Sequence, residues 1–280
     1  MKHGANVLVL LVLLAASSGV QSAPIVGASA NTIPEGTFMV DGWFLVRDFT
    51  WAYENSSESW TTLPGNTSET ATTFMPRLYY GLNDWLTLRL GVPIEDRYRD
   101  RPEYDDSRSS TGFGDLVFDP KIRVYESEDG DTRAALLMGV RVPTGDTEAD
   151  IALSDGSTDV MIGAVATHNS GGASGHVCVT HWLNGENEWG FDVPDLWVGT
   201  LTLEVPIDES WKLLWEAKGY AGSEDATYRR IYACPGISWS GERTTVGVSA
   251  LVSAYRDGDT AVSPYDFDWA PCLRVYYRFF

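Results

Sequence analysis

The side chains best placed to do chemistry in this chain are charged residues that alternate with apolar ones. Around Arg89, for example, Leu86, Leu88 and Leu90 alternate with Thr87 and Arg89. Because successive side chains of a β-strand point to opposite faces, this spacing gathers the charges on one face and the apolar side chains on the other. Charged side chains on a common face can line a polar conduit and select solutes by charge.

A group of histidines offers a second kind of chemistry. His168, His176 and His181 occur with Ser170 and Ser174 nearby, and an outer-membrane lipase would use such a Ser/His pair. However, no G-x-S-x-G element occurs, and both serines fall in a Gly-rich turn. We therefore expect no catalytic residue, no enzymatic activity and no cofactor.

The sequence gives little support to a metal site or a disulfide framework. Cys178, Cys234 and Cys272 are odd in number, widely spaced and without a CxxC pair or a Cys/His cluster. We expect small buried cysteines, with one incidental disulfide as the alternative. Acidic runs such as the one from Asp96 to Asp106 could bind divalent cations that bridge lipopolysaccharide. Because no D-x-[DN]-x-[DN]-G loop is present, we expect a solvated acidic rim and no metal site.

The composition excludes several classes of protein. The 280 residues carry 20 Lys and Arg against 39 Asp and Glu, a formal net charge of −19, which argues against nucleic-acid binding. Hydrophobic residues make up 44% of the chain, too many for a disordered acidic protein. The one long apolar run, Val7 to Ala16, falls short of the ~20 residues that a membrane-spanning helix needs.

The apolar run has the features of a secretory signal. Lys2 and His3 precede it, and a small-residue cleavage site ends at Ser22. We expect a signal peptide over residues 1–22, removed after Sec-type export. Residues 23–37 would then form a periplasmic N-terminal segment.

A two-residue period of apolar side chains recurs along the rest of the chain and predicts about twelve β-strands. Most are ~9–12 residues long, which is enough to cross a bilayer at a tilt. The expected strands are residues 38–53, 70–82, 85–94, 113–125, 132–142, 158–168, 176–183, 195–206, 211–221, 228–239, 244–255 and 265–280.

The connections between these segments alternate in length. Five are short, and the six that are mostly longer and polar are residues 54–69, 95–112, 143–157, 184–194, 222–227 and 256–264. This alternation is typical of an all-β, up-and-down antiparallel transmembrane barrel with short periplasmic turns and longer extracellular loops. We therefore predict an outer-membrane β-barrel over residues 38–280.

A soluble β-sandwich is the alternative, because its strands also have one apolar face. Aromatic side chains near strand ends, such as Trp85, favour the membrane, where aromatic girdles lie at the interfaces. The chain also ends in an aromatic strand, although counting back from Phe280 would put Arg274 and Arg278 on the lipid face. Either the register ends at Phe279 or this strand contains a bulge.

If the apolar faces contact lipid, the charged faces line the lumen, because an Arg or Lys facing lipid at the midplane costs ~2–4 kcal/mol. The side chains expected to face inward are the positive Arg47, Arg77, Arg89, Lys121, Arg123, Arg133, Arg141, Lys212, Lys218, Arg230, Arg274 and Arg278, and the negative Asp41, Asp115, Asp119, Asp159, Glu204, Glu216, Asp266 and Asp268. Those expected to line a pore are Arg77, Arg89, Asp115, Asp119, Lys121, Arg123, Arg133, Arg141, Lys212, Glu216 and Lys218. The positive excess gives a mild preference for anions. The alternative is that ion pairs such as Asp115 with Lys121 knit the lumen shut.

Short motifs carry a family resemblance over about residues 80–160. Residues 112–116 read G-F-G-D-L, residues 142–146 read V-P-T-G-D, and residues 80–86 read Y-G-L-N-D-W-L. The sequence thereby resembles the outer-membrane family described as "Putative MetA-pathway of phenol degradation". The resemblance implies a barrel that imports small molecules, some of them aromatic, and it supports fold and location more than a particular substrate.

The sequence as a whole predicts a monomeric outer-membrane channel for passive uptake of small polar or amphipathic molecules, including aromatic ones. The partners expected are outer-membrane lipid and lipopolysaccharide, the barrel-assembly machinery and the solutes, with no nucleic acid. Two alternatives stay open. One is a non-conducting structural or adhesive surface barrel, and the more remote one is a secreted soluble β-sandwich that binds a ligand.

Overall fold

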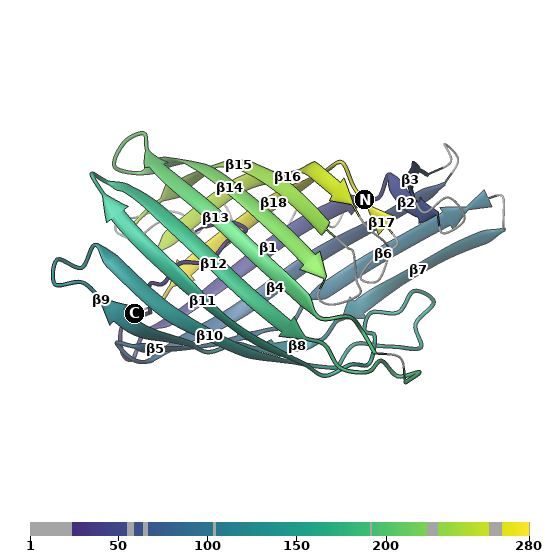
Figure 1. Cartoon of the computed structure of the whole chain (residues 1–280), viewed down its shortest axis with the longest axis horizontal. Helices are drawn as coiled ribbons and strands as arrows, with labels where there is room; N and C mark the ends of the chain where they lie inside the picture. The colour runs from purple at the N-terminus through teal and green to yellow at the C-terminus, as the bar shows by residue number, and fades with distance from the viewer. Residues whose placement is uncertain are drawn as a thin grey trace.

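The computed structural model describes residues 24–54, 59–63, 67–102, 105–190, 192–222, 229–257 and 265–279. It is a closed antiparallel barrel of twelve wall strands, strongly tilted in the side view of Figure 1. The signal peptide expected over residues 1–22 lies outside the described residues. The wall consists of β1 (Phe38–Asp48), β4 (Ser68–Asn83), β5 (Leu86–Gly91) with β6 (Ile94–Arg101), β7 (Asp106–Phe113) with β8 (Leu116–Phe118) and β9 (Lys121–Glu126), β10 (Thr132–Val142), β11 (Asp159–Ser170), β12 (Ala173–Leu183), β13 (Leu196–Pro206), β14 (Trp211–Gly222), β15 (Arg229–Ser240), β16 (Thr244–Asp257) and β18 (Trp269–Arg278).

Two wall strands are interrupted by bends. β5 and β6 together pair with β4, and the break between them contains Pro93. β8 and β9 pair with both β5 and β10, and the break between them contains Pro120. Proline has no N–H to donate to a β-ladder, so both prolines fit at positions where the ladder stops. The barrel closes where β1 pairs with β18, from Met39 opposite Arg278 to Leu45 opposite Cys272.

The alternation read from the sequence is confirmed along the wall. On β14, Trp215 is 60% exposed on the outer face while its neighbour Glu216 is 5% exposed on the inner one. β10 spans the same residues, 132–142, that the period predicts. β18 pairs with β1 and β16 without a register shift, Arg274 is buried and Phe279 is exposed. The register therefore ends at Phe279, and the closed barrel excludes the β-sandwich.

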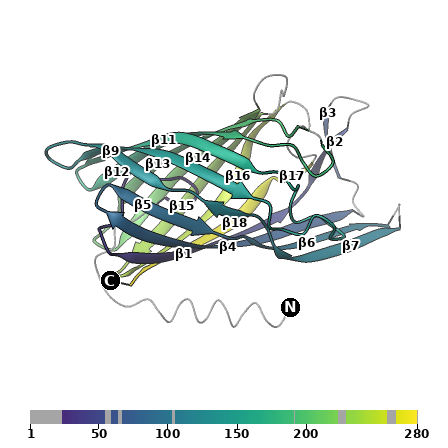
Figure 2. The ribbon, with the colours of Figure 1, turned by 90° about the horizontal axis from the view of Figure 1, so that it is seen from below.

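The short turns lie at one end of the barrel and most of the long connections at the other (Figures 1 and 2). One expected loop is wrong. Residues 95–112 are mostly β6 and β7, a hairpin that extends the wall at the long-loop end. The alternating pattern fails there because polar side chains occupy both faces. Ion pairs stabilise the hairpin instead, with Arg99 and Arg101 both bound to Glu69 of β4 at 2.9 and 3.0 Å.

A small second sheet stands at the same end. It joins β2 (Trp51–Glu54) and β3 (Ser59–Thr62) from the first long connection to β17 (Tyr265–Asp266) from the last. The indole Nε1 of Trp51 donates to Asp268 at 2.7 Å. The two connections that flank the β1–β18 seam are therefore tied to each other. Among the described residues, the structure contains no helix long and apolar enough to cross a membrane.

The lumen contains an apolar core that the sequence analysis does not anticipate. One cluster is formed by Leu45, Leu214, Tyr232, Cys234, Leu251, Phe267, Ala270 and Cys272 together with Ile25 from the N-terminal segment. A second cluster brings Ala30 against Ala135, Leu137, Met161, Val165 and Cys178. Side chains facing inward are thus partly apolar, and they pack on a piece of the chain that enters the barrel.

Residues 24–34, which we call the strap, run inside the lumen. Over this stretch, the N-terminal segment that we expect at residues 23–37 lies within the barrel. The physical reason is that the inner wall satisfies the backbone of the strap, and that two apolar side chains of the strap, Ile25 and Ala30, are 1% and 0% exposed against the wall.

Candidate functional site

Glu216 holds the first residues of the strap. Its two carboxyl oxygens accept hydrogen bonds from the backbone N–H groups of Ile25, Val26 and Gly27 at 2.8 to 3.2 Å, and Oε2 also accepts from the Thr202 hydroxyl. A carboxyl group that accepts from several successive amides binds a segment of chain through its backbone. Glu216 is therefore an anchor for the strap.

Further wall residues bind the rest of the strap. The Thr167 and Thr87 hydroxyls accept from the N–H groups of Ala30 and Ile33 at 2.8 and 2.9 Å. The ammonium group of Lys121 donates to the carbonyl oxygen of Ser29 at 3.1 Å. These anchors lie on β5, β9 and β11, so the strap is tied to the wall at separated points of its circumference.

Glycines in the wall make room for the strap. A Cβ atom on Gly247 would lie 2.6 Å from Ile25, and one on Gly236 would lie 3.3 Å from it. Near the short-turn end, a Cβ on Gly81 would lie 2.1 Å from the Pro34 carbonyl oxygen. Backbone atoms cannot yield as a flexible side chain does, so the approach at Gly81 requires glycine.

Substituting alanine for Gly81 should push the end of the strap off the wall and lower the stability of the folded barrel by ~1–3 kcal/mol, the usual cost of overpacking. Gly199→Ala is the matched control, since a Cβ there meets nothing within 4 Å and the residue also lies in a strand. The temperature at which the compact folded form disappears on unboiled SDS gels measures the stability of both variants. Equal transition temperatures for the two variants would contradict this account of Gly81.

Asp41 is the centre of a buried charge cluster at the barrel seam. It is 3% exposed and accepts from Arg77 Nε at 2.9 Å, from Tyr79 Oη at 2.7 Å and from the Arg274 guanidinium at 2.7 Å. Arg274 also donates to the carbonyl oxygen of Pro24 at 2.8 Å. The cluster thus connects β1, β4, β18 and the strap.

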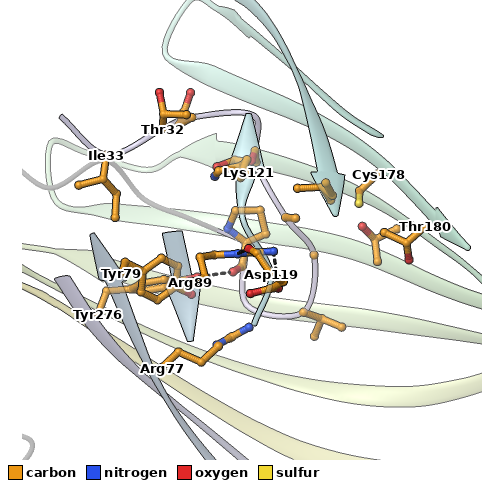
Figure 3. Close-up of a pocket in the computed structure, with 18 of the residues that line it drawn as sticks. Thr32, Ile33, Arg77, Tyr79, Arg89, Asp119, Lys121, Cys178, Thr180 and Tyr276 are labelled. Atoms are coloured by element: carbon orange, nitrogen blue, oxygen red, sulfur yellow. Dashed lines mark hydrogen bonds and ion pairs between the residues drawn. The ribbon is translucent and has the colours of Figure 1, made fainter. Parts of the chain in front are cut away.

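A second ion pair lies on the neighbouring strands. Arg89 of β5 donates to a carboxylate oxygen of Asp119 at 2.5 Å and to the Asp119 carbonyl oxygen at 3.0 Å. Asp119 follows β8 at the bend before Pro120, so the interruption of this strand presents both its carboxylate and its carbonyl to one arginine. Figure 3 shows this pair beside Lys121 and Arg77.

A cavity of about 600 Å³ remains in the middle of the lumen beside the strap. Its walls are formed by the strap together with Met39, Arg77, Tyr79, Arg89, Asp119, Lys121, Leu137, Met161, Cys178, Thr180, Trp182, Val198, Thr200, Lys218, Arg274, Tyr276 and Arg278 (Figure 3). These residues come from ten strands, so the cavity is bounded by most of the circumference of the barrel.

The structure brings five of the expected pore residues to this cavity, namely Arg77, Arg89, Asp119, Lys121 and Lys218. Glu216 faces the lumen beside Lys218, but its oxygens are occupied by the strap. Tyr79, which is not among the side chains expected to line a pore, is 6% exposed and lines the cavity. A signal was available for it, since Tyr79 shares its face with Arg77.

The other five expected pore residues lie away from the cavity. Arg123 and Arg133 both pair with Glu126 near the short-turn end, and Lys212 pairs with Glu204 at 3.1 Å. Arg141 pairs with the buried Asp159. Asp115 accepts from the backbone N–H groups of Thr144 and Gly145 at 3.2 and 3.1 Å, so it fixes the connection after β10.

The histidines and cysteines form no catalytic arrangement in the described part of the chain. His176 lies between the Thr167 hydroxyl and Glu204, while the Ser174 hydroxyl donates to Asn169. All three cysteines are buried and free, so the expectation of small buried thiols is confirmed. No group of three or more His, Cys, Asp or Glu side chains is arranged to hold a metal ion in the described ranges.

Comparison with known proteins agrees with this architecture. The family model described as "Putative MetA-pathway of phenol degradation" matches residues 35–261. The chain belongs to this family. No protein with a curated description matches the sequence of this family member.

Solved structures similar to this family member are outer-membrane barrels. The COG4313 outer membrane channel from Pseudomonas putida F1 has a TM-score of 0.74 and 13% identity, over 93% of this chain and 100% of that one. The translocator domain of the autotransporter NalP from Neisseria meningitidis has a TM-score of 0.53 and 12% identity, over 87% of this chain and 88% of that one. At these identities the likeness establishes the fold of the family member.

Proposed function

We propose that this protein is an outer-membrane channel through which small polar or amphipathic molecules enter passively. Its short turns would face the periplasm and its long connections the outside, after residues 1–22 are removed. The observation that carries the proposal is the cavity of about 600 Å³ that stays open in the lumen beside the strap. In a barrel with a purely structural role, side chains would be expected to fill this space, because a void in a packed interior loses van der Waals contacts.

The channel proposal is also supported by the nature of the lining. Charged and hydroxyl-bearing side chains such as Arg77, Lys121 and Thr180 line the cavity beside apolar ones. A lumen with both kinds of surface can pass amphipathic solutes that a purely apolar core would exclude. We propose no enzymatic step, no cofactor and no metal for this transport.

A non-conducting structural or adhesive barrel is the second candidate. The observation that favours it is the occupancy of the lumen by the strap and by ion pairs such as Arg89 with Asp119. In that case the cavity would have no continuous path to either end of the barrel. The partners would still include outer-membrane lipid and lipopolysaccharide.

Conductance of the purified barrel in planar bilayers distinguishes the two candidates. A channel gives discrete steps in the intact chain, and larger steps when residues 24–34 are replaced by a Gly/Ser linker, which has no apolar side chain to pack where Ile25 packs against the wall. Heat-modifiable mobility on SDS gels shows that both proteins are folded. Absence of steps in both folded proteins would refute the channel and favour the structural barrel.

Reversing the charge at Arg89 should shift ion selectivity towards cations. Arg89 lines the cavity, so Arg89→Glu places a negative charge where a positive one stood and repels anions from the conduit. Arg141→Glu is the matched control, because Arg141 lies outside the cavity. Reversal potentials in a salt gradient measure the effect, and no shift in folded Arg89→Glu protein would show that Arg89 does not face the path of the ions.

A further inference from the structure

The cavity in the lumen has a cationic side. Arg274 of β18, Arg77 of β4, Arg89 of β5 and Lys121 of β9 come from wall strands that follow one another around the barrel, with only β1 between the first two. Lys121 lies within electrostatic range of Arg89 and Arg274 and of the carboxylate of Asp119. Four positive charges are thus gathered within five neighbouring strands of the twelve in the wall.

The carboxylates beside these cations are too few to balance them. Asp41 is shared by Arg77 and Arg274, and Asp119 is bound by Arg89. Lys121 has no ion pair among the described residues, and it uses one of its three N–H donors on the Ser29 carbonyl oxygen. The cationic side therefore carries a net positive charge and has ammonium donors to spare.

The opposite side of the cavity is mainly apolar, although the Thr180 and Thr200 hydroxyls also lie on it. Leu137 pairs across the β9–β10 ladder with Lys121, so the change from charge to hydrocarbon occurs between adjacent strands. Met161, Trp182 and Val198 continue this wall on β11, β12 and β13. Lys218 of β14 stands at its far edge, near the ring of Tyr220 and with no ion pair in the described part of the chain.

We propose that this cavity is a binding site for small aromatic carboxylates, a substrate class for the channel proposed above, on which the inference rests. The carboxylate would lie against Lys121 and the neighbouring Arg89 guanidinium, and the ring against Met161 and Trp182. Aromatic rings contact tryptophan and methionine favourably, and a charge-assisted hydrogen bond is roughly twice as strong as one between neutral groups. The cavity volume is in the range of about 300–1,000 Å³ that small-molecule sites occupy.

The negative charge of the proposed ligand complements the cationic side of the cavity, and its aromatic ring complements the apolar side. A neutral aromatic ring would leave the buried Lys121 ammonium without a counter-charge, which is costly for a buried charge. Acetate or inorganic phosphate would supply the charge but would leave the apolar wall unfilled. The chemistry of the two walls together selects a molecule that is both anionic and aromatic.

Isothermal titration calorimetry of the full barrel folded in detergent tests the inference with four probes. Benzoate should bind saturably, whereas benzamide, acetate and phosphate should bind at least about tenfold more weakly, the effect of losing one charge-assisted hydrogen bond or the ring contacts. Equal affinity for benzoate and benzamide would overturn the role of the cations. Equal affinity for benzoate and acetate would overturn the role of the apolar wall.

Variants locate the binding in the cavity. Lys121→Met and Lys218→Met, which keep the length of the side chain, should each weaken benzoate binding, about tenfold for Lys121→Met. Lys212→Met removes the same charge outside the cavity and should leave the affinity unchanged. Benzoate binding that survives both cavity substitutions in folded protein would place the site elsewhere and refute the inference.

The conductance and benzoate-binding measurements test the channel and the binding site separately. Conductance steps without saturable benzoate binding would leave the channel standing and remove the aromatic carboxylate. Binding without conductance would leave the site standing and remove the channel.

Discussion

Replacing Glu216 with glutamine should loosen the start of the strap and raise the conductance of single reconstituted channels. Glutamine retains one acceptor oxygen and presents an NH₂ group to the N–H donors of Ile25, Val26 and Gly27, which the carboxyl group satisfies in the native chain. An unsatisfied buried donor costs about 1–3 kcal/mol, so the population of channels with a displaced strap should rise about five-fold to more than a hundred-fold.

Planar-bilayer recording measures this rise as larger and more frequent steps. Glu204→Gln is the matched control, since Glu204 is also a fully buried inward glutamate but binds Lys212 and His176 instead of the strap. We expect Glu204→Gln to reduce stability without enlarging the steps. Unchanged conductance in folded Glu216→Gln protein would mean that the strap does not limit the path.

Substituting asparagine for Asp41 should destabilise the barrel by about 3–5 kcal/mol, the usual cost of removing one partner from a buried ion pair. Asp41 is the shared counter-charge of Arg77 and Arg274, which lie on β4 and β18 on either side of β1. Without it, two guanidinium groups face each other in the lumen with only a neutral amide between them. The seam where the first strand meets the last is therefore the part expected to weaken.

The temperature at which the folded form disappears on unboiled SDS gels measures this loss. Asp106→Asn is the matched control, because Asp106 pairs with the half-exposed Arg108 at the end of the β6–β7 hairpin. Exposed ion pairs contribute about 0–1 kcal/mol, so the control should unfold close to the temperature of the native chain. An equal fall of the unfolding temperature in both variants would show that the Asp41 cluster stabilises the barrel no more than an exposed ion pair does.

Much of the wall can be predicted from the sequence because its physical cause is local. Lipid on one side and lumen on the other impose a period of two, and the lipid-facing side chains of β10 from Ala134 to Val142 and of β14 from Trp211 to Ala217 are apolar throughout. The same period places Arg89 and Lys121 on the inner face, since hydrocarbon would penalise them. On β6 and β7 polar side chains occupy both faces, so the two-residue period of apolar side chains is absent there and does not predict these strands.

The strap could not be predicted in this way because its partners are remote in the chain. Ile25 and Glu216 are 191 residues apart, and no period relates them. The residues that bind the strap, such as Thr167 and Thr87, look like any inward polar residue of a strand. The apolar core of the lumen was missed for a related reason. Leu214 and Leu251 occupy inward positions because the strap brings Ile25 against them.

The mode of attachment of the strap has a consequence for how the family can diverge. Glu216, Lys121, Thr167 and Arg274 recognise main-chain N–H and C=O groups, which every amino acid except proline supplies in full. Substitutions at exposed strap positions can therefore accumulate while its path through the barrel stays the same. We expect relatives to keep the anchors in the wall and the small residue at position 27, and to vary freely in the rest of the strap, so that lumens of different chemistry can evolve on an unchanged barrel.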